Sequence, residues 1–102
     1  LLSQVLINMI NNSIDALKEQ ENKKILLKIS DNPNGNLIIS VIDNGKGILQ
    51  EDLDKIFLPF YTTKQDGSGI GLSLSRQIMN LHKGSIGVKS VPGQQTMIRL
   101  AF

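Results

Sequence analysis

The sequence predicts a two-layer α/β sandwich, with helices packed on one face of a mixed, mostly antiparallel sheet. Two segments with a helical apolar period are interleaved with two pairs of short apolar segments. A turn containing Pro and Gly lies within each pair, which is typical of antiparallel hairpins. No strand–helix–strand alternation is present, and this argues against a doubly wound parallel sheet.

The first helix is predicted over residues 1 to about 20, because apolar residues fill one half of its circumference. Asn8, Asn12, Asp15 and Glu19 line up along the other half. Asn is a poor helix former, because its side chain competes for backbone hydrogen bonds. The asparagines indicate either a solvated face, which more often carries Glu, Lys and Arg, or a hard oxygen ligand suited to Mg²⁺.

The first hairpin is predicted from strands over residues 23–31 and 36–43, with a turn at 32–35. Ile25, Leu27 and Ile29 fall on one face of the first strand, and the largely buried second strand ends on Asp43. A carboxylate there is costly without a partner. Asp43 either caps the following turn or accepts a hydrogen bond from an exocyclic amine, with Gly45 and Gly47 leaving room for a flat ring.

The stretch from residue 49 to residue 66 is the least regular part of the chain. Residues 50–56 favour one or two helical turns, and residues 57–64 hold three of the four aromatic residues around a proline. So long a connection is typical of a lid or binding loop. Its aromatic residues would anchor it to the body, and Lys64 either reaches a terminal phosphate or is simply exposed.

Glycine occupies alternate positions at Gly67, Gly69 and Gly71, immediately before the second helix. Without Cβ atoms the backbone approaches a ligand closely, and a helix start offers free N–H groups and partial positive charge. This combination suits phosphate, although a flexible linker before an ordinary helix has the same composition.

The rest of the chain is predicted as a helix and a second hairpin. The apolar stripe of the helix is Ile70, Leu74, Ile78 and Leu81. Gly84, after Lys83, supplies a glycine stop. Strands over residues 85–91 and 95–102 then flank a turn at 92–93.

Composition narrows the classes of function. The 102 residues suffice for one domain with one core, and 40% apolar and 20% charged residues are typical of a folded soluble protein. The chain has no cysteine, which excludes disulfides and thiolate metal sites. Its net charge of +2 comes from scattered lysines with few aromatic residues, which disfavours nucleic-acid binding. No segment approaches the length of a membrane span.

Four motifs together resemble the ATP-binding catalytic domain of bacterial sensor histidine kinases, within the group shared with DNA gyrase, the ninety-kilodalton heat-shock chaperone and mismatch-repair ATPases. Residues 8–13 resemble the N box and residues 43–47 the first glycine box. Residues 57–60 resemble the F box and residues 67–72 the second glycine box. The resemblance covers residues 1–102 and implies the histidine-kinase ATPase fold with a long glycine-rich ATP lid.

The resemblance also implies roles for single residues. Asp43 would bind the adenine amino group, and Asn12 would ligate the Mg²⁺ that bridges the phosphates. Thr96 would lie close to Asp43, although residues 93–96 lack the family's second glycine, and Ala16 stands where some relatives place an aromatic residue. The implied ATP-binding residues are Asn8, Asn12, Asp43, Gly45, Gly47, Lys64, Gly67, Gly69, Gly71, Leu72 and Thr96.

The residue type at position 8 distinguishes the subfamilies of this group of ATPases, and here it is Asn8. Gyrase-like and chaperone-like members have a water-activating glutamate there, and an asparagine cannot act as a general base. The resemblance therefore implies transfer of the γ-phosphate to a histidine on a separate dimerisation domain, outside residues 1–102. The only histidine, His82, is expected to be structural.

The implied cofactors are ATP and Mg²⁺, and the implied partners are the chain's own dimerisation domain and a response regulator. We expect a cytoplasmic domain without direct membrane contact, in a homodimeric parent protein that an inner-membrane segment could anchor. The alternatives are a serine protein kinase of the anti-sigma-factor type and an ATP-dependent switch that transfers no phosphate.

Overall fold

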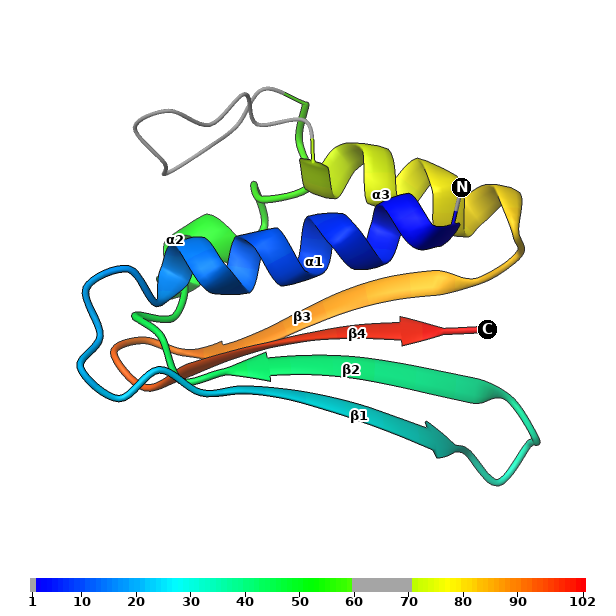
Figure 1. The fold of residues 1–102 in the computed structure, drawn as a ribbon. Coiled ribbons are helices and arrows are strands. Elements are labelled where there is room, and N and C mark those ends of the chain that lie inside the picture. The colour runs from blue at the N-terminus through cyan, green and yellow to red at the C-terminus, as the bar shows by residue number, and fades with distance from the viewer. Residues whose placement is uncertain (1, 60–70) are drawn as a thin grey trace.

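A computed structural model describes residues 2–59 and 71–102 of the chain. The helices are α1 (Leu2–Ala16), α2 (Gln50–Leu53) and α3 (Gly71–Leu81). The strands are β1 (Ile25–Asp31), β2 (Leu37–Asp43), β3 (Ser85–Val91) and β4 (Gln95–Ala101). Figure 1 shows α1 and α3 lying side by side over one face of the sheet, which confirms the predicted two-layer sandwich.

The strand order is β1-β2-β4-β3, and each neighbouring pair is antiparallel. The four described strands therefore contain no parallel pair, where the sequence predicted a mixed, mostly antiparallel sheet. β4, the last strand, lies between β3, its own hairpin partner, and β2 of the first hairpin, so it holds the two halves of the chain in one sheet. One core cluster joins the layers, through Val5, Met9, Val41, Ile78, Met79, Ile98 and Leu100.

α1 ends four residues earlier than predicted, at Ala16. Its chain continues in a tighter turn, in which the N–H of Leu17 donates to the carbonyl of Ile14. The buried stripe of α1 is also narrower than its apolar half. Val5, Met9 and Ser13 are buried, whereas Ile10 and Ile14 are exposed.

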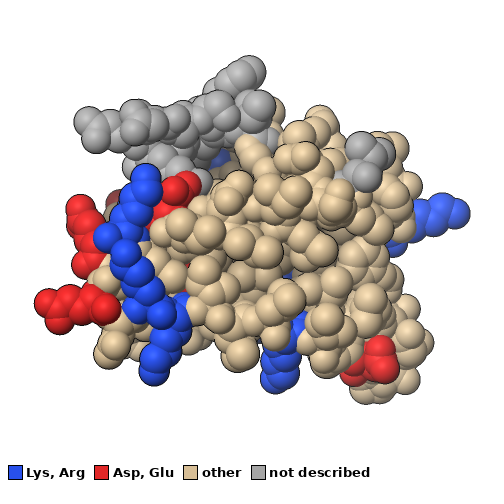
Figure 2. Space-filling model, in the orientation of Figure 1, with Lys and Arg blue, Asp and Glu red and all other residues tan. Residues whose placement is uncertain are grey.

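β1 is an edge strand with every residue exposed. The register places Leu27 opposite Val41 and Ile29 opposite Ile39, so the predicted apolar face does point to the helix side. It stays uncovered because the helices pack against the other strands, α1 against β2 and α3 against β3. Figure 2 shows the molecule in the orientation of Figure 1. On the side that it shows, the charged side chains lie around the margin and the middle is uncharged.

The apolar stripe predicted for α3 is wrong in part. Ile78 is buried, but Leu74 and Leu81 are exposed, and Ile70 lies outside the described residues. The helix instead turns Ser75 and Met79 inward, because its inner face must meet both α1 and the sheet.

The end of α3 also differs from the prediction. Lys83, and not Gly84, has the left-handed backbone, with φ of 61°. The N–H of Gly84 donates to the carbonyl of Met79 at 2.8 Å and that of Lys83 to Asn80 at 3.1 Å, which is the Schellman arrangement. Gly84 is needed for another reason: a Cβ there would lie 2.6 Å from the carbonyl oxygen of Ala101.

Candidate functional site

Asp43 ends β2 as a buried carboxylate, 3% exposed, on the face of the sheet that the helices cover. Its Oδ1 accepts a hydrogen bond from the N–H of Gly45 at 3.0 Å. This is the turn-capping role that the sequence offered as the plainer alternative, and it uses one carboxylate oxygen. The Asp43 side chain makes no other hydrogen bond among the described residues, so Oδ2 keeps its capacity to accept one.

Protein contacts fix the loop after Asp43 on the helix side. A Cβ on Gly45 would lie 2.6 Å from the carbonyl oxygen of Ala16 and 2.9 Å from its Cβ. Gly45 therefore allows the end of α1 and the end of β2 to meet. The sequence did not predict this contact, because the lack of a Cβ at Gly45 was interpreted as room for the flat ring of a ligand.

Gly47 has a positive φ of 73°, and a Cβ there would lie 2.6 Å from the carbonyl oxygen of Val91. The neighbouring Ile48 N–H donates to Ser90 Oγ at 2.6 Å. Gly47 therefore seats the loop on the β3–β4 hairpin. Whether Gly45 and Gly47 also leave room for a ring stays a prediction.

Asn44 is a positioning residue that the sequence reasoning missed. Its Oδ1 accepts from the N–H of Lys24 at 2.8 Å, and its Nδ2 donates to the carbonyl of Asn22 at 2.6 Å. Gln20 Nε2 also donates to the carbonyl of Asn44. The connection between α1 and β1 is thus tied to the residue after Asp43, and these bonds hold the end of β2 in place.

Thr96 lies directly beside Asp43, since the two residues are register partners across β2 and β4. Ser90 pairs with Thr96 in the next strand, and their hydroxyl oxygens are 3.4 Å apart. A row of polar side chains therefore crosses one end of the sheet beneath the helices. The sequence predicted that Asp43 and Thr96 would be close; the only sign of Ser90 was its inward place in the alternation of β3.

Asn8 connects α1 to the start of α3. Its Nδ2 donates to the carbonyl of Gly71 and to Ser75 Oγ, both at 3.3 Å, and its Oδ1 accepts from Gln4. Asn8, Gly71 and the following Leu72 are thus brought together, as the predicted phosphate side requires. The start of α3 offers backbone N–H groups and partial positive charge there.

Asn12 lies one helical turn before Ala16 on α1, so it belongs to the same end of the molecule as Asp43. It makes contacts of its own within the structure. Lys64, Gly67 and Gly69 lie outside the described residues. Phe57, which precedes that stretch, lies 5.3 Å from the Arg76 guanidinium, measured to its ring centre, so it is anchored to α3.

His82 has the structural position expected of it. Its Nδ1 lies 2.9 Å from the carbonyl oxygen of Ile78, within the last turn of α3. The described residues contain no cluster of three or more His, Asp or Glu side chains able to hold a metal ion. None of the described helices is long and apolar enough to cross a membrane.

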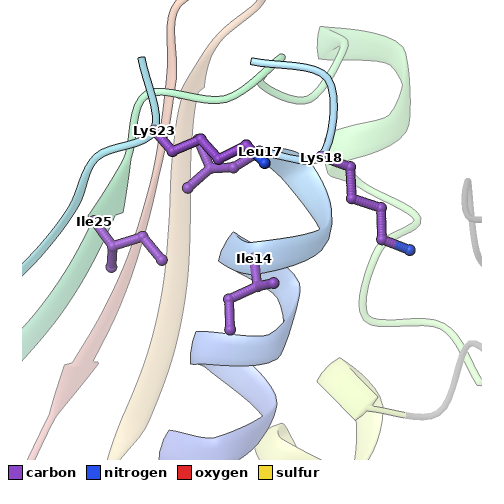
Figure 3. A pocket seen from close by; sticks show the side chains of 5 residues that line it. All are labelled: Ile14, Leu17, Lys18, Lys23 and Ile25. Carbon is purple, nitrogen blue, oxygen red and sulfur yellow. The ribbon is translucent and has the colours of Figure 1, made fainter. Parts of the chain in front are cut away.

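A hollow of about 350 Å³ lies elsewhere, between the end of α1 and the start of β1. Figure 3 shows Ile14 of α1, Leu17 just after that helix and Ile25 of β1 turned toward this space, with Lys23 beside them. None of the predicted site residues lines it, so we do not equate it with the candidate site.

The antiparallel α/β sandwich, with Asp43 where β2 meets the end of α1 and Asn8 where α1 meets α3, agrees with the fold that the four motifs implied. The chain belongs to the family described as histidine kinase-, DNA gyrase B-, and HSP90-like ATPases, whose family model matches residues 1–102.

Curated relatives place the resemblance among sensor kinases. The sensor histidine kinase ZraS of Salmonella typhi is 41% identical over 93 residues, covering 91% of this chain and 20% of that protein. The histidine-protein kinase AtoS of Escherichia coli is 43% identical, covering 91% and 15%. Sporulation kinase D of Bacillus subtilis is 40% identical, covering 99% and 19%. The chain thus spans about a fifth or less of the length of these relatives.

Solved structures agree. The catalytic domain of histidine kinase ThkA matches with a TM-score of 0.81 and 35% identity, covering 97% of this chain and 63% of that one. Full-length ShkA in complex with AMPPNP matches with a TM-score of 0.80 and 30% identity, covering 96% and 20%. The sensor histidine kinase MprB has a TM-score of 0.84 at 19% identity, which shows the fold alone.

Proposed function

We propose that this domain binds Mg-ATP and donates the γ-phosphate to a histidine on a separate dimerisation domain of a two-component sensor kinase. The observation that carries the proposal is Asp43, a buried carboxylate at the end of a strand with one oxygen committed to Gly45 and the other available. A buried acceptor of this kind matches the exocyclic amine of adenine. ShkA, a structural neighbour, was solved with the ATP analogue AMPPNP.

The two ends of the proposed site have different chemistry. Asp43 and Thr96 would hold the base, with Gly45 and Gly47 shaping the loop beside it. Asn8, Asn12, Gly71 and Leu72 would face the phosphates, and Lys64, Gly67 and Gly69 would complete that end.

The donor set fits Mg²⁺ bound mainly by the nucleotide. Asn12 offers a neutral carboxamide oxygen, and Mg²⁺ commonly takes one or two protein groups together with phosphate oxygens and water. The metal would neutralise charge on the phosphates, and Asn12 would orient it.

Asn8 supports transfer over hydrolysis. A carboxamide is no general base, and its Nδ2 is already bonded to Gly71 and Ser75 at the start of α3. Catalysis by this domain would then consist of positioning and charge neutralisation. The acceptor would come from the parent's dimerisation domain, and a response regulator would take the phosphate from it. The histidine kinases among the relatives support a kinase role.

ATP use favours a cytoplasmic location for the domain, in a homodimeric parent. Neither nucleic acid nor direct membrane contact is part of the proposed function.

The test is to incubate the full-length parent protein with γ-labelled ATP and Mg²⁺, and then to challenge the label with acid and with base. Acid-labile, base-stable label supports histidine phosphorylation, and its loss in the Asp43→Asn variant assigns it to this domain. Acid-stable label on a second protein would indicate the serine-kinase alternative. ATP binding without any label would indicate the switch, and rapid release of inorganic phosphate would overturn the kinase assignment.

A further inference from the structure

The face of the sheet turned away from the helices carries three cations, and none of its strand residues is acidic. Alternation and register place Lys28 of β1, Lys89 of β3 and Arg99 of β4 on this face. All three side chains are exposed, and none makes an ion pair with a residue that the structure describes. Figure 1 shows that α1 and α3 lie over the other face. The positive charge is therefore uncompensated within residues 2–59 and 71–102.

Ser40 lies between two of these cations, as the register partner of Lys28 on one side and of Arg99 on the other. It is only 7% exposed, yet its hydroxyl has no hydrogen-bond partner among the described residues. Solvent still reaches this oxygen, since Ser13 Oγ is the only fully sealed side-chain polar atom without a partner in the described part of the chain. Buried hydroxyls are normally hydrogen-bonded, so Ser40 is a free donor beside two positive charges.

Gly87 continues the same row across the sheet, as the register partner of Arg99. Glycine weakens the interior of a strand, and there it often marks the close approach of a ligand or another main chain. The fold gives no reason for this glycine, because its φ is not positive and a Cβ there would meet no atom within 4 Å. We call these four register partners the cross-strand row: Lys28, Ser40, Arg99 and Gly87.

We propose that the cross-strand row binds an acidic segment of a partner protein. The guanidinium of Arg99 offers two parallel N–H groups to a carboxylate, and the hydroxyl of Ser40 donates a further hydrogen bond to it. Lys28 and Lys89 add positive charge on either side. The main chain of the segment rests over Gly87, where no side chain stands in its way. The surface is separate from the proposed nucleotide site, which lies on the face that the helices cover.

The remaining side chains of this face favour a protein over a nucleic acid or a membrane. None of its strand residues is aromatic, so bases find no ring to stack on. Three cations are fewer than the clusters of about four to eight that attract proteins to anionic lipids. Beside the row, Ile42 and Met97 are half-buried and Leu26 is 56% exposed. Arginine and methionine beside apolar side chains are typical of protein interfaces.

The experiment measures binding of a fluorescein-labelled, glutamate-rich peptide to the full chain by fluorescence anisotropy, without nucleotide. Arg99→Glu and Lys28→Glu should each weaken binding at least about fivefold, through the loss of a surface ion pair. Lys55→Glu is the matched control, because Lys55 is an equally exposed lysine just after α2, on the helix side of the sheet (Figure 1). At physiological ionic strength this distant charge is screened, so the control should change binding little.

Gly87→Val separates binding from stability. Valine favours a strand, so the variant should unfold at a higher urea concentration. It should nevertheless bind the peptide more weakly, because its side chain occupies the place of the segment. Unchanged peptide binding in Gly87→Val would overturn the proposal.

The controls distinguish the kinds of partner. Absence of peptide binding by the wild-type chain, or equal weakening in Lys55→Glu, would overturn the proposal. Binding of phosphatidylserine vesicles or of oligothymidylate in place of the peptide, lost in Arg99→Glu, would also overturn it and assign the row to a membrane or a nucleic acid. Calorimetric titration of Arg99→Glu with ADP should match the wild type, so a failure of this proposal leaves the proposed function standing.

Discussion

Replacing Asp43 by Asn separates the two roles that the structure gives this carboxylate. The amide keeps Oδ1, so the bond from the N–H of Gly45 is retained. It replaces Oδ2, the proposed acceptor for adenine, by a group that donates. A hydrogen bond to a charged group contributes about 1.5–3 kcal/mol, so the loss corresponds to roughly 10–150-fold in ADP affinity.

The stability of Asp43→Asn should move little, because the 3% exposed charge is replaced by a neutral group of the same shape. Asp43→Ala should lose affinity as well, but it also removes the partner of the Gly45 N–H, which costs about 1–3 kcal/mol of unfolding free energy. Titration with ADP and urea unfolding measure both quantities. The exposed Asp31→Asn, at the far end of β1, is the control and should change neither.

Asp43→Asn binding ADP within twofold of wild type, with unchanged stability, would refute the assignment of Oδ2. Equal stability of Asp43→Asn and Asp43→Ala would show that the bond to Gly45 is unimportant to the fold. The two substitutions thus test the recognition claim and the structural claim independently.

Four further substitutions test other parts of the structure. Lys83→Gly should raise the unfolding free energy by roughly 0.5–1 kcal/mol, because φ of 61° strains a residue with a Cβ. Gly84→Ala should lower the unfolding free energy, because its Cβ would lie against the carbonyl oxygen of Ala101. Urea midpoints that move the other way would contradict the helix-end geometry. Asn8→Asp should destabilise the chain by about 1–3 kcal/mol in the same assay, since a carboxylate cannot donate to the carbonyl of Gly71, and unchanged stability would dismiss that link. Asn12→Ala should weaken Mg-ATP binding far more than Mg-free ATP binding in calorimetric titrations, and equal losses would count against a metal role.

The sequence predicted the layers of the fold because period and turn chemistry are local properties. The Pro and Gly turns predicted both hairpins, and alternation predicted which residues of β1 share the face toward the helices. It could not predict which apolar residues stay uncovered. Leu74, Leu81 and the face of β1 are apolar in sequence, but their exposure depends on where the helices lie across the sheet.

The sequence pointed to those candidate site residues that lie within a recognisable motif. Asp43 was identifiable because a carboxylate at the end of a buried strand is unusual, and Asn8 because asparagine disfavours helices. Asn44 escaped notice because its partners, Asn22 and Lys24, belong to a connection without a pattern of its own.

α1 connects the two ends of the proposed site. Near its end, Ala16 lies against Gly45 and so sets the height of the helix above Asp43. Eight residues earlier, about 12 Å along the axis, Asn8 holds the start of α3 by two hydrogen bonds. A tilt of α1 would therefore displace the base end and the phosphate end together. We expect substitutions at this contact, such as Gly45→Ala, to weaken binding of the whole nucleotide, because a Cβ at Gly45 must push the helix away from the strand.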